Sequence, residues 1–462
     1  MVKHQGYSEY KDSGVEWLGN TPVHWDAKPL KFLCTYNDEV LADSVSDDYE
    51  IEYVDIGSVS ATEGVTKTES MFFGKAPSRA RRIVRDGDVI ISTVRTYLEA
   101  IASIDNQPEN LVVSTGFAVI RPNSILHKGY AAFCLRASGF IKEVVAQSVG
   151  VSYPAINASD LVNIKVPEPT LEEQQKIASF LDHETAKIDT LIEKQQQLIK
   201  LLKEKRQAVM SHAVTKGLDP SAPMRDSGVE WLGDVPAHWD VSALKYHIDT
   251  VNGFGFSSTD VCEEGVPFIR AGNIKKKSIT KTDLYLPQRV VDKYKRVVLS
   301  EGDIVISMVG SDPRILDSAV GQVGVVPKSM AGAVPNQNVV ILREKSDSIL
   351  KDFLFYILCS GPYRNHLNVF SHKLANQSII SSSLIVGAKF MLPSTLEQKK
   401  IIDFLDKRLD KVDDLVLRNY DSLELLKERR TALISAAVTG KIDVRNWQAS
   451  EPLNINNKET AA

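Results

Sequence analysis

Two basic clusters supply the side chains of this chain that could do chemistry on a ligand. In the first half, arginines gather in SRARRIVR at 78–85, and more polar side chains follow the next expected strand: Arg79, Arg81, Arg82, Arg95 and Tyr97. In the second half, basic and amide residues lie near the ends of expected strands: Arg270, Asn273, Lys275, Lys276, Lys277, Lys295 and Arg296. Such residues suit the neutralisation of phosphates, and arginine or asparagine could reach the edges of nucleic-acid bases. The alternative for each cluster is an ordinary solvated face.

Two polar loops add hydroxyls and amides that can donate hydrogen bonds to bases and accept them. The loop GVSYPAIN at 150–157 supplies Ser152, Tyr153 and Asn157. The loop HKLANQSI at 372–379 supplies Lys373, Asn376 and Gln377. Ordinary loop polarity is the alternative for each of these residues. The clusters and the loops together are our candidate DNA-binding residues.

The motifs of common catalytic sites are missing from the chain. It contains no GxxxxGK[ST] phosphate loop, no GxSxG nucleophile turn and no HExxH zinc motif. The glycines of NGFGF at 252–256 lack the GxGxxG spacing of a cofactor-binding turn, and SDPR at 311–314 reads as a turn. His24 and His238 stand beside tryptophans, where a structural role outweighs a catalytic one. We therefore expect a binding protein without a catalytic residue.

The four cysteines indicate neither a metal site nor a disulfide framework. Cys34, Cys134, Cys262 and Cys359 lie far apart and form no CxxC or Cys/His pattern. We therefore expect no bound metal and a reducing, cytoplasmic environment. The first residues lack the apolar core of a signal peptide, and the longest apolar run, 353–359, is far shorter than the roughly 20 residues of a membrane span. Neither export nor membrane insertion is expected.

Length and charge restrict the architecture and the partners. At roughly 150 residues per domain, 462 residues suggest about three globular units, or two units and something elongated. The apolar fraction of 43% and the charged fraction of 25% are typical of a folded globular protein. The formal net charge is −4, so binding to a polyanion must come from local basic patches or from a partner.

Long segments of the sequence occur twice. The repeated segments are DSGVEWLG (12–19 and 226–233), DGDVIIS with EGDIVIS (86–92 and 301–307), and 173–215 with 397–439. Between them the copies diverge, because 95–110 has no evident counterpart in 310–324. The chain is therefore a tandem duplication in which one scaffold presents two different surfaces.

Each copy is expected to hold a mixed α/β domain followed by a long helix, which makes the fold class α+β. The strand-like segments are 53–59, 88–94 and 117–120 in the first copy and 266–272, 303–309, 323–326 and 338–342 in the second. Helical spacing covers 130–147 in the first copy and 348–369 in the second, with an interruption at 361–362. We expect domains at 1–166 and 216–391, long helices at 167–215 and 392–445, and a disordered tail at 446–462.

The two long helices carry an apolar seam that needs a partner. A 4,3 alternation gives the expected pairing residues Ile177, Leu181, Ile188, Leu191, Leu198, Leu202, Val209, Ile401, Leu405, Val412, Leu415, Leu426 and Leu433. The simplest partner of each helix is the other one, in an antiparallel coiled coil. Gln195 and Asn419 interrupt the seam at mid-helix, where a buried polar contact could set the register. The alternative is that each helix packs separately on its own domain.

The two ends of the chain are also related by the repeat. The C-terminal helix ends in VTGKID, as the first helix ends in VTKGLD, and the start YSEYKDSGVEWLG resembles the continuation that follows the first helix. We therefore expect the two ends to lie close together in a pseudo-twofold arrangement.

At this point the residues resemble a known family, the specificity (S) subunits of type I restriction-modification systems. The resemblance rests on the GVEWLG…P.HW….LK segment, the GD[VI][IV]IS strand and the PEPTLEEQQKIASFLD helix start, each present twice and in this order. It covers nearly the whole chain, to about Val444. It implies two target-recognition domains that each read one half of an asymmetric, bipartite site in double-stranded DNA, with the paired helices setting the gap.

The resemblance also implies partners and cofactors. Two modification (M) subunits would dock on the helices, and restriction (R) subunits would join the complex. S-adenosylmethionine, ATP and Mg would be bound by those subunits and not by this chain. The rival interpretation is a coiled-coil assembly scaffold that never reads DNA. An independent methyltransferase is disfavoured by the missing motifs.

Overall fold

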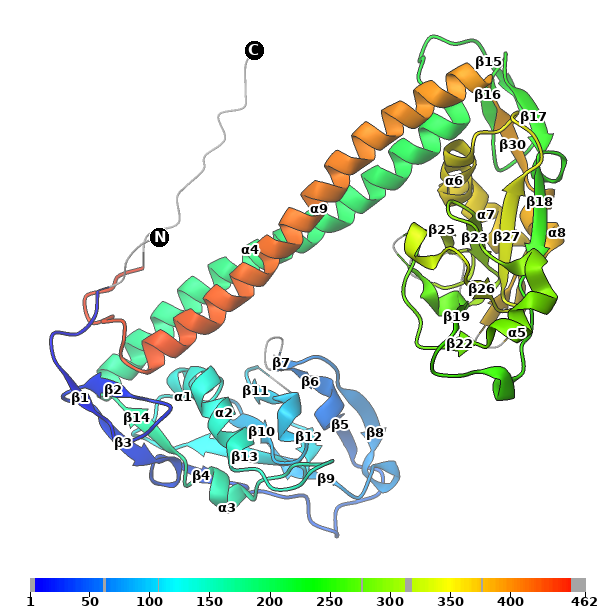
Figure 1. Ribbon diagram of the computed structural model, residues 1–462. Helices are drawn as coiled ribbons and strands as arrows, with labels where there is room; N and C mark the ends of the chain where they lie inside the picture. Colours follow the sequence, from blue (N-terminus) through cyan, green and yellow to red (C-terminus); the bar gives the residue numbers. More distant parts are fainter. Residues whose placement is uncertain are drawn as a thin grey trace, which may run out of the picture. The chain divides into compact units, whose positions relative to one another are not determined.

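The chain folds into two compact units that share two long helices (Figure 1). The computed structural model describes residues 5–60, 64–106, 108–275, 277–311, 318–374 and 377–449. The first unit comprises Met1–Gln196 and Asp421–Ala462, and the second comprises Gln197–Tyr420. The boundaries fall inside the long helices α4 (Leu171–Lys216) and α9 (Thr395–Val438), so each unit holds one mixed α/β domain and part of both helices.

The first unit is organised by two four-stranded sheets, with the orders β11-β10-β13-β4 and β8-β5-β12-β9. Their strands are β4 (Cys34–Tyr36), β5 (Glu50–Val54), β8 (Glu69–Phe72), β9 (Ala80–Ile83), β10 (Val89–Ser92), β11 (Ile101–Ser103), β12 (Leu111–Ser114) and β13 (Phe117–Pro122). Successive residues of a strand face opposite sides, so Val89 and Ile91 enter one core and Ile90 enters a second core.

Short helices and pairs of antiparallel strands accompany these sheets in the first unit. They are β1 (Tyr10–Asp12) with β2 (Asn20–Pro22), β3 (Asp26–Pro29) with β14 (Lys165–Glu168), β6 (Val59–Ser60) with β7 (Gly64–Val65), α1 (Lys128–Cys134), α2 (Ser138–Ala146) and α3 (Ala158–Leu161). The helix expected at 130–147 is therefore two helices, separated at Leu135–Ala137.

The second unit has a larger sheet, with the order β18-β27-β23-β25-β21-β20. Its strands are β18 (Ile248–Asn252), β20 (Ile274–Lys275), β21 (Ser278–Ile279), β23 (Ile304–Ser307), β25 (Val323–Val325) and β27 (Val339–Glu344). Two three-stranded sheets have the orders β22-β19-β26 and β24-β29-β28. They comprise β19 (Val266–Ile269), β22 (Tyr285–Leu286), β24 (Val309–Gly310), β26 (Val334–Pro335), β28 (His372–Leu374) and β29 (Gln377–Ile379).

The remaining elements of the second unit repeat those of the first, except for the short helix α5. They are β15 (Met224–Asp226) with β16 (Asp234–Pro236), β17 (Asp240–Ala243) with β30 (Lys389–Leu392), α5 (Gln288–Val291), α6 (Lys351–Cys359), α7 (Gly361–Phe370) and α8 (Ser382–Gly387). The expected interruption lies at Ser360, whose hydroxyl accepts a hydrogen bond from the amide of Tyr363 and so begins α7.

The repeated GD motif has a structural explanation in both units. Gly87 and Gly302 adopt φ angles of +89° and +79°, which favour glycine. The carboxylate of Asp88 accepts hydrogen bonds from Arg121 at 2.9 and 2.7 Å. In the second unit, the Asp303 carboxylate accepts one from the Arg343 guanidinium at 2.6 Å. A buried carboxylate needs such a partner, so the motif repeats because the fold needs it.

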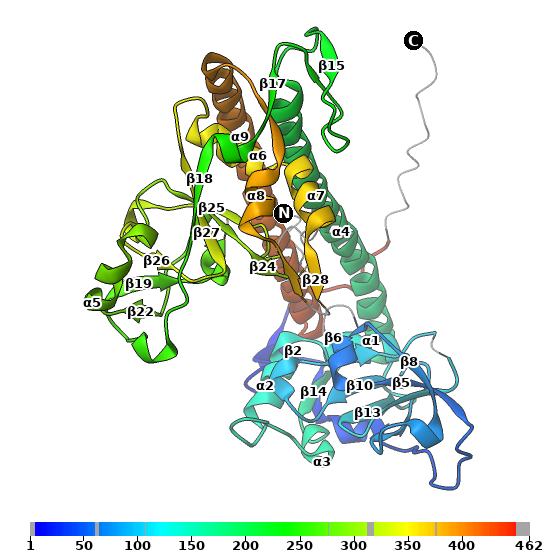
Figure 2. The ribbon, with the colours of Figure 1, turned by 90° about the vertical axis from the view of Figure 1, so that its right-hand side faces the viewer.

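The long helices pair antiparallel, as the sequence predicts (Figures 1 and 2). In the first unit, the guanidinium of Arg430 donates to Asp189 at 2.7 and 3.2 Å. In the second unit, the guanidinium of Arg206 donates to Asp413 at 2.6 and 3.0 Å. Asp189 and Arg206 lie 224 positions before Asp413 and Arg430, so one ion pair occurs twice, related by the repeat.

At every second position, the residue that the seam buries is not the one predicted from the sequence. Leu191, Leu198 and Leu415 are 48%, 43% and 46% exposed, so the prediction that they pair the helices is wrong. Ile199 and Leu423, each 6% exposed, take that side of the seam. The remaining predicted positions are buried or half-buried, and they are Ile177, Leu181, Ile188, Leu202, Val209, Ile401, Leu405, Val412, Leu426 and Leu433. The seam thus keeps one of the two predicted heptad positions and moves the other by one residue.

The mid-helix polar residues behave differently from each other. The side-chain amide of Gln195 donates across the seam to the hydroxyl of Ser422 at 3.1 Å. Asn419 instead donates to the carbonyl of Leu415 on its own helix, at 2.7 Å. Of these two residues, Gln195 makes the predicted hydrogen bond across the seam, and the hydrogen bond of Asn419 stays within its own helix.

The two ends of the described chain meet in the first unit, as expected. The hydroxyl of Tyr10 donates to the carbonyl of Gly440 at 3.1 Å, and the amide of Asp443 donates to the carbonyl of Gln5 at 2.8 Å. Trp447 packs edge-on against Phe180, so order extends one residue beyond the predicted start of the tail at 446. Most of that tail, 450–462, lies outside the described residues.

Candidate nucleic-acid interface

In the first unit, the loop after β10 and the loop after α2 lie side by side. The amide of Ile156 donates to the carbonyl of Thr93 at 2.9 Å, and the hydroxyl of Thr96 donates to that of Ser148 at 2.7 Å. A β-bridge joins Val94 to Ala155. We call residues 93–99 and 148–155 the first loop surface. It brings together four predicted site residues from separate parts of the sequence: Arg95, Tyr97, Ser152 and Tyr153.

The same place in the second unit carries a hairpin. Strand β24 follows β23 and pairs with β29 of the β28–β29 hairpin, which follows α7. The amide of Ile380 donates to the carbonyl of Met308 at 2.9 Å, matching the Ile156–Thr93 bond of the first unit. We call residues 308–310, 371–374 and 377–380 the second loop surface. Its predicted residues Lys373 and Gln377 are exposed, and Asn376 lies outside the described residues.

Three arginines of the SRARRIVR cluster, Arg79, Arg81 and Arg85, are paired with carboxylates. Arg79 is exposed and forms an ion pair with Asp55 at 3.3 Å. The guanidinium of Arg81 lies over the ring of Phe73 and forms an ion pair with Asp43 at 3.2 Å. These pairs weaken the electrostatic case for phosphate binding by this cluster.

Arg79, at the start of the cluster, nevertheless lies near the first loop surface through the turn between β12 and β13. The carbonyl of Arg79 accepts a hydrogen bond from the amide of Thr115, and the carbonyl of the next residue, Gly116, accepts one from the amide of Thr93. Arg82 lies in the half-buried edge strand β9, and burial lowers its pKa. Asn157 stands at the start of α3, where its amide donates to the carboxylate of Asp160 at 3.1 Å.

In the second unit, Arg270 follows β19 and lies near the second loop surface through the turn at 336–338. The carbonyl of Ile269 accepts a hydrogen bond from the amide of Asn336, and the carbonyl of Asn338 accepts one from the amide of Met308. The turn between them exposes Gln337, a base-reading type of side chain that sequence reasoning missed. Its signal was the amide-rich run NQN between two expected strands.

The other basic residues of the second half are dispersed. Asn273 accepts a hydrogen bond from the amide of Arg270 at 2.8 Å and so stabilises the local turn. Lys275 and Lys277 flank the β20–β21 turn, and Lys276 between them lies outside the described residues. The carbonyl of Arg296, next to Lys295, accepts a hydrogen bond from Arg343 at 3.4 Å. That contact lies beside Asp303, at the opposite end of β23 from the second loop surface.

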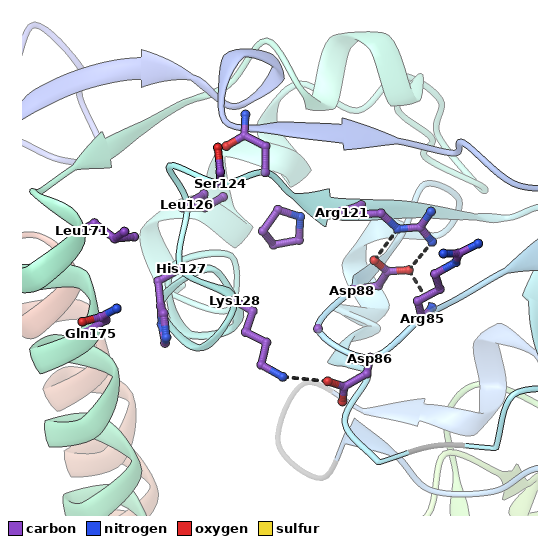
Figure 3. Close-up of a pocket in the computed structure, with 13 residues that line it drawn as sticks. Arg85, Asp86, Asp88, Arg121, Ser124, Leu126, His127, Lys128, Leu171 and Gln175 are labelled. Carbon is purple, nitrogen blue, oxygen red and sulfur yellow. Dashed lines mark hydrogen bonds and ion pairs between the residues drawn. The ribbon is translucent and has the colours of Figure 1, made fainter.

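A pocket of about 400 Å³ in the first unit has its own charges paired (Figure 3). It lies between the GD turn and the start of α4, and Lys128 donates across it to Asp86 at 2.7 Å. That hydrogen bond lowers the pKa of Asp86. The hydrogen bonds to Asp88 raise the pKa of Arg121. Because these charges compensate each other and Asp88 and Arg121 have counterparts in the second unit, we interpret the pocket as part of the framework.

The histidines and thiols singled out by their chemistry are structural. His24 lies 2.9 Å from the Glu173 carboxylate, and His238 lies 3.1 Å from that of Glu397, again related by the repeat. Burial raises the pKa of the Cys134 and Cys359 thiols to about 12, which keeps them protonated and unreactive near neutral pH. Within the described ranges, no group of three or more His, Cys, Asp or Glu side chains could hold a metal ion. No helix in that part of the chain is long and apolar enough to cross a membrane.

Comparison with known proteins gives a consistent result. The family model described as "Type I restriction modification DNA specificity domain" matches residues 22–201 and 236–424. The MjaVIII specificity subunit of Methanocaldococcus jannaschii is 28% identical over 343 residues, which cover 73% of this chain and 76% of that protein. The EcoKI specificity subunit of Escherichia coli K12 is 20% identical over 454 residues, covering 96% of this chain and 94% of that protein.

Two solved structures share the fold. One, from work on the assembly and conformational transition of the type I R-M system, has a TM-score of 0.71 at 24% identity and covers 90% of this chain and 98% of its own. The HsdS subunit of Thermoanaerobacter tengcongensis has a TM-score of 0.50 at 23% identity and covers 91% of this chain and 98% of its own.

Proposed function

We infer that this chain, which belongs to the type I restriction-modification DNA specificity family, recognises a DNA target through two half-sites, one for each domain. The observation that carries the proposal is the pair of loop surfaces. They occupy equivalent places in a duplicated scaffold, since each follows the β10 or β23 strand and closes on it through matching hydrogen bonds. Two similar supports with different loops would read two different half-sites, so the target is asymmetric.

The side chains of the two surfaces support different readings of DNA. The first exposes Tyr97, Val151 and Tyr153, whereas the second exposes Lys373 and Gln377. Glutamine can pair with the edge of adenine, and lysine can contact phosphate or guanine. The turn that carries Gln337 extends the second surface toward Arg270.

The outer faces of the long helices support docking of modification subunits. Leu191 and Leu201 on α4 are exposed, and so are their repeat counterparts Leu415 and Leu425 on α9. Large apolar side chains that are exposed at matching positions of two helices can form part of a protein interface. Because the leucines occur in repeat-related pairs, we propose that two copies of the modification subunit bind, one on each half of the pseudo-twofold scaffold.

We further propose that the chain itself is not catalytic. S-adenosylmethionine, ATP and Mg would be bound by the modification and restriction subunits. The ion-paired histidines and the buried thiols support this division of labour, because neither type of residue is placed as a general base or a nucleophile.

A selection experiment tests the proposal against the rival scaffold. The chain is purified with its modification subunit and incubated with a library of random duplex DNA, and the bound fraction is sequenced. We expect enrichment of one sequence made of two short parts separated by a constant gap. A stable complex that enriches no sequence would support the assembly scaffold instead.

A further inference from the structure

The first loop surface projects apolar side chains into solvent. Val151 is fully exposed, Val149 and Tyr153 are 81% and 66% exposed, and Tyr97 and Leu98 beside them are each about half exposed. The bridge between Val149 and Ala155 closes the loop into a narrow projection. Burial of apolar surface contributes about 25 cal/mol per Å². In the free chain the apolar side chains at the tip of the loop remain exposed to water. Contact with a partner would bury them and gain this free energy.

Arg95 stands at the base of this projection in a strained and ordered position. Its φ and ψ angles of 52° and 48° are left-handed, a conformation that costs a residue with a side chain roughly 1 kcal/mol. The guanidinium lies over the ring of Tyr153, 4.9 Å from the ring centre. The amide of the next residue, Thr96, donates to the carbonyl of Pro154 at 3.4 Å and ties the two loops together. The backbone conformation of Arg95 and the ring of Tyr153 thus fix the orientation of the Arg95 side chain.

Arg95 also differs electrostatically from four other arginines of its domain. Arg79, Arg81, Arg85 and Arg121 each form an ion pair with a carboxylate. Within the ranges that the structure describes, the guanidinium of Arg95 has no such partner. It therefore keeps its full hydrogen-bonding capacity for a ligand.

We propose that the 149–153 loop enters the major groove of one half-site, where Arg95 donates two hydrogen bonds to a guanine and Val151 packs on the methyl group of a nearby thymine. The inference rests on the proposed function and deepens it. A major groove admits a two-stranded ribbon, and guanine offers two acceptors, O6 and N7, to one guanidinium.

The same features argue against a phosphate contact for this loop. Valine and tyrosine side chains gain nothing from contact with a phosphate, whereas a thymine methyl group offers them apolar surface. The exposed carboxylate of Glu99, on the same loop as Arg95, would repel the DNA backbone. An arginine held in one orientation suits a base edge, which requires two aligned hydrogen bonds, better than it suits a mobile phosphate.

Substitution at Arg95, read out by selection from random DNA, tests the inference. The complete chain in complex with its modification subunit is used, and unaltered protein defines the two-part target. With Arg95→Ala, preference for guanine at one position of one half-site is expected to fall by about 10- to 100-fold, which corresponds to about 1–3 kcal/mol. The other half-site should be unchanged. Arg95→Lys keeps the charge but replaces the planar guanidinium with a flexible ammonium group, so the guanine preference should weaken while most of the affinity is retained.

Further variants separate the orientation of the Arg95 side chain by Tyr153 from the effect of positive charge alone. Tyr153→Phe keeps the ring under the guanidinium and is expected to keep the guanine preference, whereas Tyr153→Ala should weaken it. Lys128→Ala is the charge control, because Lys128 pairs with Asp86 beside the GD turn, at the opposite end of β10. It should leave both half-sites unchanged.

The outcomes that overturn the inference differ from those that overturn the proposed function. If Arg95→Ala lowers binding to all sequences equally, Arg95 contacts phosphate and the inference is wrong. An unchanged guanine preference, with the complex intact, overturns it as well. If unaltered protein selects no two-part sequence, the proposed function fails first and the inference fails with it.

Discussion

The phase of the helix seam can be tested with neighbouring substitutions in α4. The seam observed in the structure buries Ile199, at 6% exposure, and leaves Leu198 43% exposed. Replacing a buried isoleucine with alanine costs about 2–5 kcal/mol, and a site on a two-helix seam should lie near the lower end, at about 2–3 kcal/mol. Leu198 has just over half of its surface buried, so Leu198→Ala should cost about 1 kcal/mol, of which alanine's higher helix propensity returns a few tenths.

The measurement is urea denaturation of the complete chain, followed by the circular dichroism of its helices. The free energy of unfolding should fall by at least about 1 kcal/mol more for Ile199→Ala than for Leu198→Ala. The second helix offers a control with identical chemistry, because Leu423 is 6% exposed and Leu425 is 65% exposed. Leu423→Ala should again cost more than Leu425→Ala. If Leu198→Ala proves as costly as Ile199→Ala, the seam follows the phase predicted from the sequence and the reasoning from burial is refuted.

Three further perturbations test the framework. Gly440→Ala should lower the free energy of unfolding by at least about 1 kcal/mol more than Gly217→Ala. Both glycines have φ near +76°, but the new methyl carbon would lie 2.3 Å from a proline ring carbon at 440 and no closer than 3.2 Å to any atom at 217; equal losses would contradict this. A double-mutant cycle of Arg206→Ala and Asp413→Ala should give a coupling of about 1 kcal/mol that shrinks as salt rises, since the carboxylate is half exposed; zero coupling at low salt would contradict it. Burial raises the pKa of Glu173, but hydrogen bonds to its carboxylate lower it more, so the pKa in the folded chain is below its ordinary value. The carboxylate therefore stabilises the folded chain above the unfolded pKa of about 4.3, and this stabilisation is lost as pH falls through the lower folded pKa. Glu173→Gln should flatten the acid limb of an unfolding-versus-pH profile, and an unaltered limb would oppose that assignment.

The sequence predicts the fold well because the same structural motifs occur in both halves of the chain. Buried strands such as β10 and β23 appear as β-branched runs after a GD turn, and the turn itself needs glycine for its positive φ angle. The phase of the helix seam was not predictable in the same way. Both Leu198 and Ile199 are apolar, so either phase gives a plausible stripe. The choice depends on the packing of each helix end against its domain, which a 4,3 count does not contain.

The candidate site was only partly predictable for a different physical reason. Charge density singled out SRARRIVR, but the carboxylates that pair with it, Asp43 and Asp55, come from a distant part of the sequence. The residues now singled out in the first unit include Val149 and Val151, which in a sequence resemble ordinary core positions. Only the loop closure shows that they face solvent.

The division between repeated and divergent residues has a physical basis. Asp88 with Arg121 and Asp303 with Arg343 are buried ion pairs, and removal of one partner from such a pair leaves an uncompensated charge that costs several kcal/mol. The described parts of the loop surfaces carry no buried ion pair of this kind, because their tips are exposed and their bases are joined to the sheet end by hydrogen bonds between uncharged groups. A change at Val151, for example, removes no contact within the folded chain. The scaffold can therefore present a new DNA-reading surface in one domain without loss of stability and without altering the half-site read by the other.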